Sequence, residues 1–492
     1  MKSRVCISGF SLWLVVLSLG GCGGGSSNLD AIADKTHTET ALQLPKIDSS
    51  LDKRGNDAVG DQPPASDTNA ADSGAGDADA VDGPDTANTS DTTVTVTADA
   101  SPDTAVVDAA PEGPPPPDGP PQLPDSAFHW QNSPPAGSPF SPSTAIHELI
   151  FTGRHAMYGA ADTWFPTWGS DDNLYSPFTY GTVNGLDAGS RFAWAKIQGT
   201  DPMALTISKV GTIEVGEPGN YYGAFPAASL IVNGVWYYGG YNLDQLNGPC
   251  GLWCVAGPFI GFWTSTDYGG SWTPPPHGWS NSLFGETAKN GAKVKFAAPH
   301  AVDFGKDLQN SPDGKAYFVA HGATDPNAPL NWVTGDQIYM GRVAISPTTA
   351  NNAAAWEFFA GKDGAGAPIW SHAFADIKPL LEWPHQMGSV SMTYVAPLRK
   401  YLMAISRPVD GENNYGYYDT YFLEADSITG PYRMVQYLKS FGAQAYYVNM
   451  PSRFISRDGR TLWLEYSSQN YTPEDPAGSR YAMCLHEVVL DL

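Results

Sequence analysis

Two carboxylates stand among small and apolar residues, where acid–base chemistry is favoured. Asp162 lies in Ala160-Ala161-Asp162-Thr163-Trp164, directly before an expected strand, and Glu286 lies in Phe284-Gly285-Glu286-Thr287. Apolar surroundings raise the pKa of a carboxyl group, as a general acid requires. Asp162 is the candidate general base or nucleophile, and Glu286 is the candidate general acid. Hydrolysis of a glycosidic bond needs such a pair, about 5–5.5 Å apart for retention or roughly 6.5–9.5 Å apart for inversion.

Other candidates precede the expected innermost strands and mix charged groups, imidazoles and flat aromatic rings. Sugar sites use this mixture, because C–H faces stack on rings while hydroxyls need paired donors and acceptors. His300 is a further catalytic candidate. The alternative for each of these residues is a satisfied polar group or a core aromatic. The candidate substrate-binding residues are Arg154, Trp164, Tyr222, His385, Gln386 and Asn449.

Several common active-site motifs are missing from the sequence. It contains no G-x-S-x-G, no H-E-x-x-H and no G-x-x-x-x-G-K, and no two histidines fall within four residues of each other. These absences disfavour lipase-type, zinc-protease and P-loop chemistry. No metal site and no cofactor are predicted, although a central cation is left open.

The fold that positions these residues is indicated most clearly at Ser265 to Trp272, which reads S-x-D-x-G-x-x-W. This is the Asp-box pattern of β-propellers. Asp267 is expected to accept hydrogen bonds from backbone N–H groups of its own turn, Gly269 to supply a positive φ, and Trp272 to pack beneath the loop. The pattern lies at the end of the fold opposite the expected site, so Asp267 is predicted to be structural.

A cadence of strand, polar turn and strand returns five times after residue 150, which predicts an all-β fold and specifically a five-bladed β-propeller. Residues 128–492 would supply about 73 residues to each repeat. A large β-sandwich is the alternative. Asp171 and Asp172 occupy one of the turns, so a turn role is favoured over catalysis. The predicted hairpins, each with its turn, are Trp164–Thr179 with Asp171-Asp172-Asn173, Phe225–Tyr241 with Asn233-Gly234, Pro299–Gly322 with Asp313-Gly314, Ser389–Ser406 with Pro397-Leu398-Arg399, and Met450–Ser468 with Asp458-Gly459.

The first 21 residues resemble a bacterial lipoprotein signal peptide. Lys2 and Arg4 precede the apolar run Leu12 to Leu19, and Leu19-Gly20-Gly21-Cys22 follows. The run is too short for a permanent membrane span, so cleavage with lipidation of Cys22 is predicted. An ordinary secretory signal with a chance cysteine is the alternative. Anchoring at the cell envelope follows, with Gly23 favouring the outer membrane or cell surface.

Residues 22–127 are predicted to be a disordered linker, followed by the propeller domain at 128–492. Residues 55–125 hold fifteen acidic and no basic side chains, and so carry −15 of the net charge of −24. Such a segment lacks the apolar surface that offsets ordering entropy, and self-repulsion extends it. The chain has no basic patch with interleaved aromatics, so nucleic acid is not an expected partner. The membrane is an expected partner only through the lipid anchor.

Three cysteines would remain after processing and lipidation. Cys250 and Cys254 lie in a loop rich in glycine, and a disulfide between them is predicted, with two free thiols as the alternative. Cys484 lies in an apolar strand and is predicted to be a core residue.

Several segments resemble the bacterial family called domain of unknown function 4185, a five-bladed propeller related to furanosidases and sialidases. The matching segments are Phe259–Trp272, Phe296–Gly305, Gly388–Met403, Ser427–Tyr432 and Pro451–Tyr466. Some members are similar to endo-acting D-arabinanases. In that family, an acidic residue before the first inner strand pairs with a second one on the next strand. These positions align with Asp162 and Tyr180, so the resemblance implies a Tyr where a carboxylate is usual. Tyr180 is therefore a further catalytic candidate, as a nucleophile of the kind that sialidases use.

The sequence and the resemblance together predict a lipid-anchored protein that binds a polysaccharide and hydrolyses it, with a furanose-rich or other neutral glycan as substrate. A non-catalytic glycan-binding or adhesion module is the first alternative, and a purely structural surface protein is another. A sialidase ranks lower, because it would need arginines to converge on the substrate carboxylate, with Arg154, Arg407 and Arg453 as the candidates.

Overall fold

The structure is a computed structural model of the 492-residue chain. It describes residues 122–131, 133–185, 191–215, 221–245, 256–278, 280–288, 292–409, 417–441, 445–468 and 481–492. The predicted anchor Cys22 and the predicted disulfide partners Cys250 and Cys254 lie outside these ranges. None of the helices in the described ranges has the length and hydropathy to cross a membrane.

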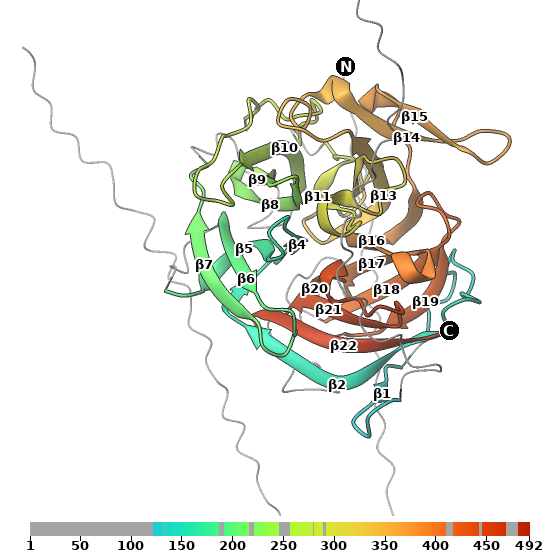
Figure 1. Ribbon diagram of the computed structural model, residues 1–492. Coiled ribbons are helices and arrows are strands. Elements are labelled where there is room, and N and C mark those ends of the chain that lie inside the picture. The colour runs from blue at the N-terminus through green and yellow to red at the C-terminus, as the bar shows by residue number, and fades with distance from the viewer. Residues whose placement is uncertain are drawn as a thin grey trace, which may run out of the picture. The chain divides into compact units, whose positions relative to one another are not determined.

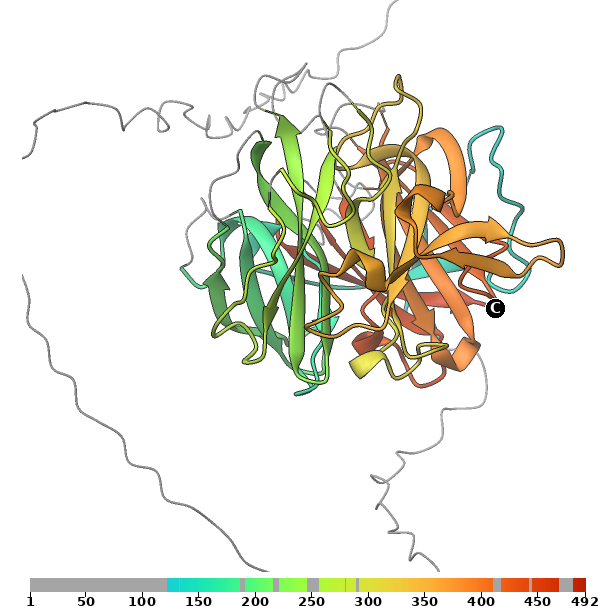
Figure 2. The ribbon, with the colours of Figure 1, turned by 90° about the horizontal axis from the view of Figure 1, so that it is seen from above.

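The described chain is all-β, with short 3-10 turns as its only helices. Antiparallel sheets surround a common axis, and Figure 1 looks down it with β4, β8, β11, β16 and β20 nearest the centre. Seen from the side, the strands run broadly along this axis (Figure 2). This propeller-like arrangement brings positions far apart in the sequence to one centre.

The first sheet places Asp162 at the end of its innermost segment. Its strands pair in the order β3, β5, β6, β7, and β4 pairs with β5 beside β3. The bounds are β3 Ala160–Asp162, β4 Thr167–Trp168, β5 Leu174–Thr182, β6 Ala193–Gln198 and β7 Thr206–Thr212.

The second sheet is a three-stranded meander of β8 Tyr221–Val232, β9 Val235–Gln245 and β10 Ala256–Ser265. The two-residue turn Asn233-Gly234 joins β8 to β9, with φ of +50° and +77°. These positive angles match the twist of the flanking strands, as the Asn-Gly pair predicts. Beyond β10, Thr264 bridges to Thr273.

The turn between β10 and Thr273 has the contacts expected of Asp267. The Asp267 carboxylate accepts hydrogen bonds from the Ser271 N–H and the Ser265 hydroxyl, at 2.8 and 2.7 Å. Gly269 has a φ of +92°, and the Trp272 ring lies 5.1 Å from the Trp236 ring. The Ser271 and Ser265 bonds lower the pKa of Asp267 to about 2. The residue stabilises this turn.

A nine-stranded sheet forms the next part of the ring. Strand β16 joins its two halves. The first half of this strand pairs with β13 and its second half pairs with β17. The preceding strands are β11 Ala297–Ala301, β12 Ala316–Gly322, β13 Thr334–Val343, β14 Trp356–Lys362 and β15 Pro368–Ser371. The remaining strands are β16 Leu381–Val395, β17 Lys400–Pro408, β18 Tyr418–Ala425 and β19 Arg433–Leu438.

The last sheet joins the two ends of the folded chain. Strand β22 Met483–Asp491 pairs with β21 Thr461–Ser467 on one side and with β2 Glu148–Tyr158 on the other. The innermost strand is β20 Tyr446–Asn449, and the short β1 Phe128–His129 lies outside β2. A strand from the start of the domain thus closes the ring against the end of the chain.

Five short 3-10 turns lie between strands of the described chain: η2 Lys306–Leu308, η3 Ala353–Ala355, η4 Phe374–Asp376, η5 Ala396–Leu398 and η6 Ser452–Phe454. All five predicted polar turns join an innermost strand to its antiparallel neighbour. One boundary was wrong: the fifth innermost strand is Tyr446–Asn449 rather than a strand beginning at Met450. Cys484 is fully buried in β22, as predicted.

Candidate functional site

Strained backbone gathers in the strands that approach the axis. Thr163, Ala298, His385 and Tyr447 have φ between +43° and +60° on or directly beside innermost strands, and Tyr180 has +43° on β5. This region costs an ordinary residue about 1–3 kcal/mol and persists only where the surroundings impose it. Strand register also shifts at Ala161/Asp162, Ala297/His300 and Tyr446/Asn449. Such bulges redirect side chains and occur often beside active sites.

Asp162 lies in a cluster of buried hydroxyl groups near these strained residues. Its Oδ1 accepts hydrogen bonds from the hydroxyls of Thr179 and Thr163, and its Oδ2 accepts one from Tyr446. The Tyr481 hydroxyl also donates to this carboxylate. Thr179 lies on β5, Tyr446 lies on β20, Thr163 directly follows β3, and Tyr481 precedes β22. Four hydroxyl donors therefore converge on one carboxylate.

Burial and the hydroxyl donors act on Asp162 in opposite directions. Burial raises the pKa of its carboxyl from 3.8 to about 6, and the hydrogen bonds from Thr179, Tyr446, Thr163 and Tyr481 limit the rise. The loss of hydration thus outweighs the donors. A carboxyl with this pKa changes charge near neutral pH, which suits acid–base chemistry.

The backbone beside Asp162 is tied to the last sheet. The Thr163 N–H donates to the Ser467 hydroxyl oxygen at 3.1 Å, and both residues are buried. Ser467 ends β21, whereas Thr163 follows β3, so this bond spans the closure between the ends of the chain. It helps to hold Thr163 at its φ of +60°.

A group of packed aromatic rings lies next to the Asp162 cluster. The His300 ring lies 4.6 Å from Phe165 and 6.3 Å from Tyr447, and Trp332 lies 4.9 Å from Tyr446. Burial lowers the pKa of His300 to about 3, so its imidazole is neutral. Its buried Nε2 has no hydrogen-bond partner among the described residues. This environment disfavours His300 as a proton acceptor at neutral pH.

Tyr180 lies near the same cluster. Its ring is 6.1 Å from Phe225, and its charge contributes, after burial and Asp162, to raising the pKa of Tyr481. Tyr180 follows Thr179, whose side chain binds Asp162 directly. The residue opposite Asp162 in the β3–β5 pairing is thus Thr179 rather than the aligned tyrosine.

Glu286 belongs to a different cluster. Its carboxylate accepts hydrogen bonds from the backbone N–H groups of Lys295 and Phe296, at 2.7 and 3.2 Å, and it lies near Tyr339 of β13. The residue is half-buried but its carboxyl is enclosed, and burial raises the pKa of that carboxyl to about 7 against the effect of the two N–H donors. These contacts hold the segment that leads into β11.

His385 and Gln386 lie on β16, next to a third polar cluster. The His385 side chain is 62% exposed, and its backbone N–H donates to Asp336 at 2.7 Å. Gln386 accepts hydrogen bonds from Arg407 and Tyr421, at 3.1 and 2.8 Å. Gln386 therefore has structural partners, while the His385 imidazole remains accessible.

Arg154 and Trp164 are not placed as expected. Arg154 lies on β2, the strand that closes the last sheet, and not in the lead-in to the first sheet; it pairs with Glu487 at 2.5 Å. Trp164 is fully buried, stacks 5.0 Å from Phe178 and donates to the Ala161 carbonyl. Its ring therefore offers no face to a ligand.

Asn449 and Tyr222 complete the predicted set. Asn449 is buried, and its amide donates to Glu465 and to the Tyr447 carbonyl oxygen. Burial raises the pKa of Glu465 well above its usual value, against the hydrogen bond from Asn449. Tyr222 lies on β8, and its side chain is outside the described part of the structure.

The candidate site therefore centres on Asp162, with Tyr180 and His300 near it and Glu286 in a separate cluster. Sequence reasoning missed Thr179, Tyr481 and Ser467 as its partners. Thr179 could have been inferred from the sequence, because the predicted hairpin places it on the strand next to Asp162. The other two come from the far end of the chain, and only the ring closure brings them close.

Thr179→Val should raise the pKa of Asp162 by about one unit, because it removes a hydrogen bond to the charged form with little change of volume. The carboxyl titration of Asp162 followed by carbon NMR measures this shift. Thr206→Val, on the exposed strand β7 of the same sheet, is the matched control. An unchanged titration would show that Thr179 does not stabilise the carboxylate.

Comparison with known proteins gives remote structural likenesses alone. No protein-family profile and no curated protein sequence matches the chain. Among solved structures, a protein from Bacteroides ovatus described as a hydrolase is 13% identical with a TM-score of 0.41, over 70% of this chain and 90% of that one. An α-L-arabinofuranosidase from Podospora anserina is 11% identical with a TM-score of 0.35, over 75% and 98% of the two chains.

A third similar structure is the catalytic domain of an α-L-arabinofuranosidase from Coprinopsis cinerea, with 13% identity and a TM-score of 0.35 over 74% of this chain and 98% of that one. Likeness at these scores assigns no activity to this chain. Support for the radial sheets and for the Asp162 cluster comes from the strand pairing and the hydrogen bonds of this structure itself.

Proposed function

We propose that this protein is a five-bladed β-propeller that binds a neutral polysaccharide at its axis and hydrolyses it. Asp162 is the general base or nucleophile, and Glu286 is the general acid. The observation that carries the proposal is the buried Asp162 carboxyl, placed at a bulge beside strained backbone, with a pKa of about 6. Titratable groups with strongly shifted pKa values are concentrated at functional sites.

The blade count is part of this proposal. The nine-stranded sheet divides at the bend of β16, so the strand pairing supports five radial sheets with innermost strands β3–β4, β8, β11, β16 and β20. A relationship to the domain of unknown function 4185 family, the Asp-box identity of the 265–272 turn and lipid anchoring through Cys22 complete the proposal.

The two carboxyls suit different steps. Asp162, with the lower pKa, is charged first and can accept a proton from water or attack the sugar, while Glu286 stays protonated longer and can protonate the leaving oxygen. These roles require the two carboxyls to lie on opposite sides of one glycosidic bond, about 5–9.5 Å apart. A furanose-rich or other neutral glycan is the proposed substrate.

A non-catalytic glycan-binding module is the second candidate. It is favoured by the hydroxyl donors on both oxygens of Asp162, which engage the carboxylate in holding strands together. A sialidase has less support, because the three arginines do not share one cluster: Arg407 pairs with Asp419 at 3.7 Å, apart from Arg154 and Arg453.

The decisive experiment is incubation of the purified protein with a panel of polysaccharides that includes arabinan, xylan and sialylated glycans. Release of reducing sugar from a neutral member supports hydrolysis. Binding without release favours the module, and release of sialic acid alone contradicts the neutral substrate.

The pH dependence tests the two roles. Asp162 must be ionised and Glu286 protonated, so kcat/KM should fall below about pH 6 and above about pH 7. Glu286→Gln should remove the alkaline limb and lower the rate. A rate constant that is level from pH 5 to pH 8 is incompatible with these assignments.

A further inference from the structure

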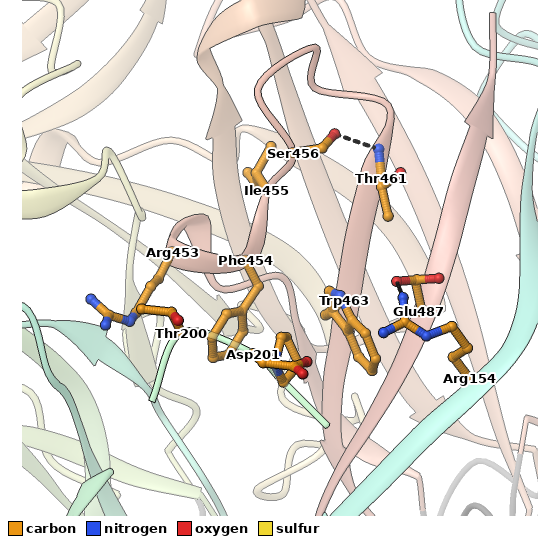
Figure 3. Close-up of a pocket in the computed structure, with 11 residues that line it drawn as sticks. Arg154, Thr200, Asp201, Arg453, Phe454, Ile455, Ser456, Thr461, Trp463 and Glu487 are labelled. Atoms are coloured by element: carbon orange, nitrogen blue, oxygen red, sulfur yellow. Dashed lines mark hydrogen bonds and ion pairs between the residues drawn. The ribbon is translucent and has the colours of Figure 1, made fainter. Parts of the chain in front are cut away.

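A hollow of about 350 Å³ opens between the first and last sheets, apart from the Asp162 cluster. Figure 3 shows its lining: Thr200 and Asp201 from the turn after β6, Arg453 from η6, and Trp463, Glu487 and Arg154 from β21, β22 and β2. Its volume is at the small end of the roughly 300–1,000 Å³ of small-molecule sites.

The hollow and the Asp162 cluster use opposite ends of β21. Ser467, at the end of the strand, binds the backbone beside Asp162, whereas Thr461 and Trp463, at its start, line the hollow. At the usual rise of a strand, Trp463 and Ser467 are about 13 Å apart. The two sites are therefore separate but share one rigid element.

The two guanidinium groups of the hollow are held in place. Arg154 donates to Glu487 at 2.5 Å and lies 5.4 Å from the Trp463 ring centre. Arg453 donates to the Gly199 carbonyl oxygen at 3.2 Å and lies 5.5 Å from the Trp168 ring centre. Half of the Arg154 side chain remains exposed. Donors fixed in this way lose little freedom when a ligand binds.

The charges in the hollow balance. Two arginines face two carboxylates, Glu487 and Asp201, so neither a strong anion nor a strong cation is preferred. Fixed donors beside carboxylate acceptors match a ligand whose groups both donate and accept, as sugar hydroxyls do. Phe454 and Pro202 also line the hollow but are themselves buried, so its polar groups carry the recognition.

We infer that this hollow is a second glycan-binding site, which takes one or two neutral sugar residues and is independent of hydrolysis at Asp162. It would hold a polysaccharide chain against the side of the domain while the axial site acts on another part. The inference stands whether the axial site is catalytic or only binds.

Native affinity electrophoresis in gels that contain arabinan, xylan or polygalacturonate tests this site. All variants are made in the full chain carrying Asp162→Asn, so that hydrolysis does not enter the readout. Arg154→Ala removes a fixed donor, and Thr200→Trp fills the hollow from an exposed loop position. Arg433→Ala, at an exposed arginine on β19 that contacts Thr144, is the matched control.

Retardation by at least one neutral polysaccharide is expected, with a dissociation constant about tenfold weaker in Arg154→Ala and Thr200→Trp than in the control. Three results would overturn the inference: no retardation by arabinan or xylan, equal retardation of all variants, or preferential retardation by the anionic polygalacturonate.

Discussion

Asp162→Asn should lower kcat on the hydrolysed polysaccharide by roughly a thousandfold, within the ~10²–10⁴ that a positioned acid–base group contributes. The amide keeps an oxygen that can accept from Thr179 and Thr163, and the Tyr446 and Tyr481 hydroxyls can rotate to accept from the new N–H. The fold and the shape of the site should therefore persist, and glycan affinity should change by less than about threefold.

Reducing-sugar release and calorimetric binding measure these two quantities on the same preparation. Asp303→Asn is the comparison, because Asp303 is another enclosed carboxyl but binds the Ser452 N–H and hydroxyl at 2.7 and 2.6 Å, away from the Asp162 cluster. Asp303→Asn should change the free energy of unfolding and leave kcat unchanged. Full activity in Asp162→Asn would remove this residue from the mechanism and assign hydrolysis to another group.

The turns were the part of the fold most open to prediction. Asn233-Gly234, Asp313-Gly314 and Asp458-Gly459 are local signals, since each pair itself favours the backbone angles of a tight turn. The role of β2 was not local, because Glu148–Tyr158 pairs with a strand more than 300 residues later. Nothing in that segment identifies its partner, so Arg154 was assigned to the wrong sheet.

The candidate site also combines features that are local in the sequence with contacts between residues far apart in it. The position of Asp162 was visible in the sequence, but the expected apolar surroundings proved to be hydroxyls from the neighbouring strand β5 and from the far end of the chain. The raised pKa of Glu286 was anticipated from Phe284 and Gly285, yet its carboxyl binds the backbone of residues nine and ten positions later. Sequence reasoning located the acids and could not supply their partners.

A second large effect is expected in the pH dependence of stability. The Asp162 carboxyl has a pKa of about 6 in the folded protein against an ordinary 3.8, so the folded state binds more protons between these values. Its contribution to stability is therefore full below about pH 4 and is lost as the pH rises through about 6. At one pKa unit per 1.36 kcal/mol, the wild type loses about 3 kcal/mol that Asp162→Asn does not lose.

Urea unfolding of both proteins at pH 4 and pH 7.5 measures this difference, and the Asp162→Asn protein should gain about 2–2.5 kcal/mol on the wild type between the two conditions, because the unfolded carboxyl is already partly ionised at pH 4. Asp363→Asn, in the exposed turn between β14 and β15, should follow the wild type at both values. Parallel behaviour of Asp162→Asn and the wild type would mean that the carboxylate is not desolvated. A gain as large as expected would show that ionised Asp162 destabilises the fold at neutral pH, which is the trade-off typical of a residue retained for function.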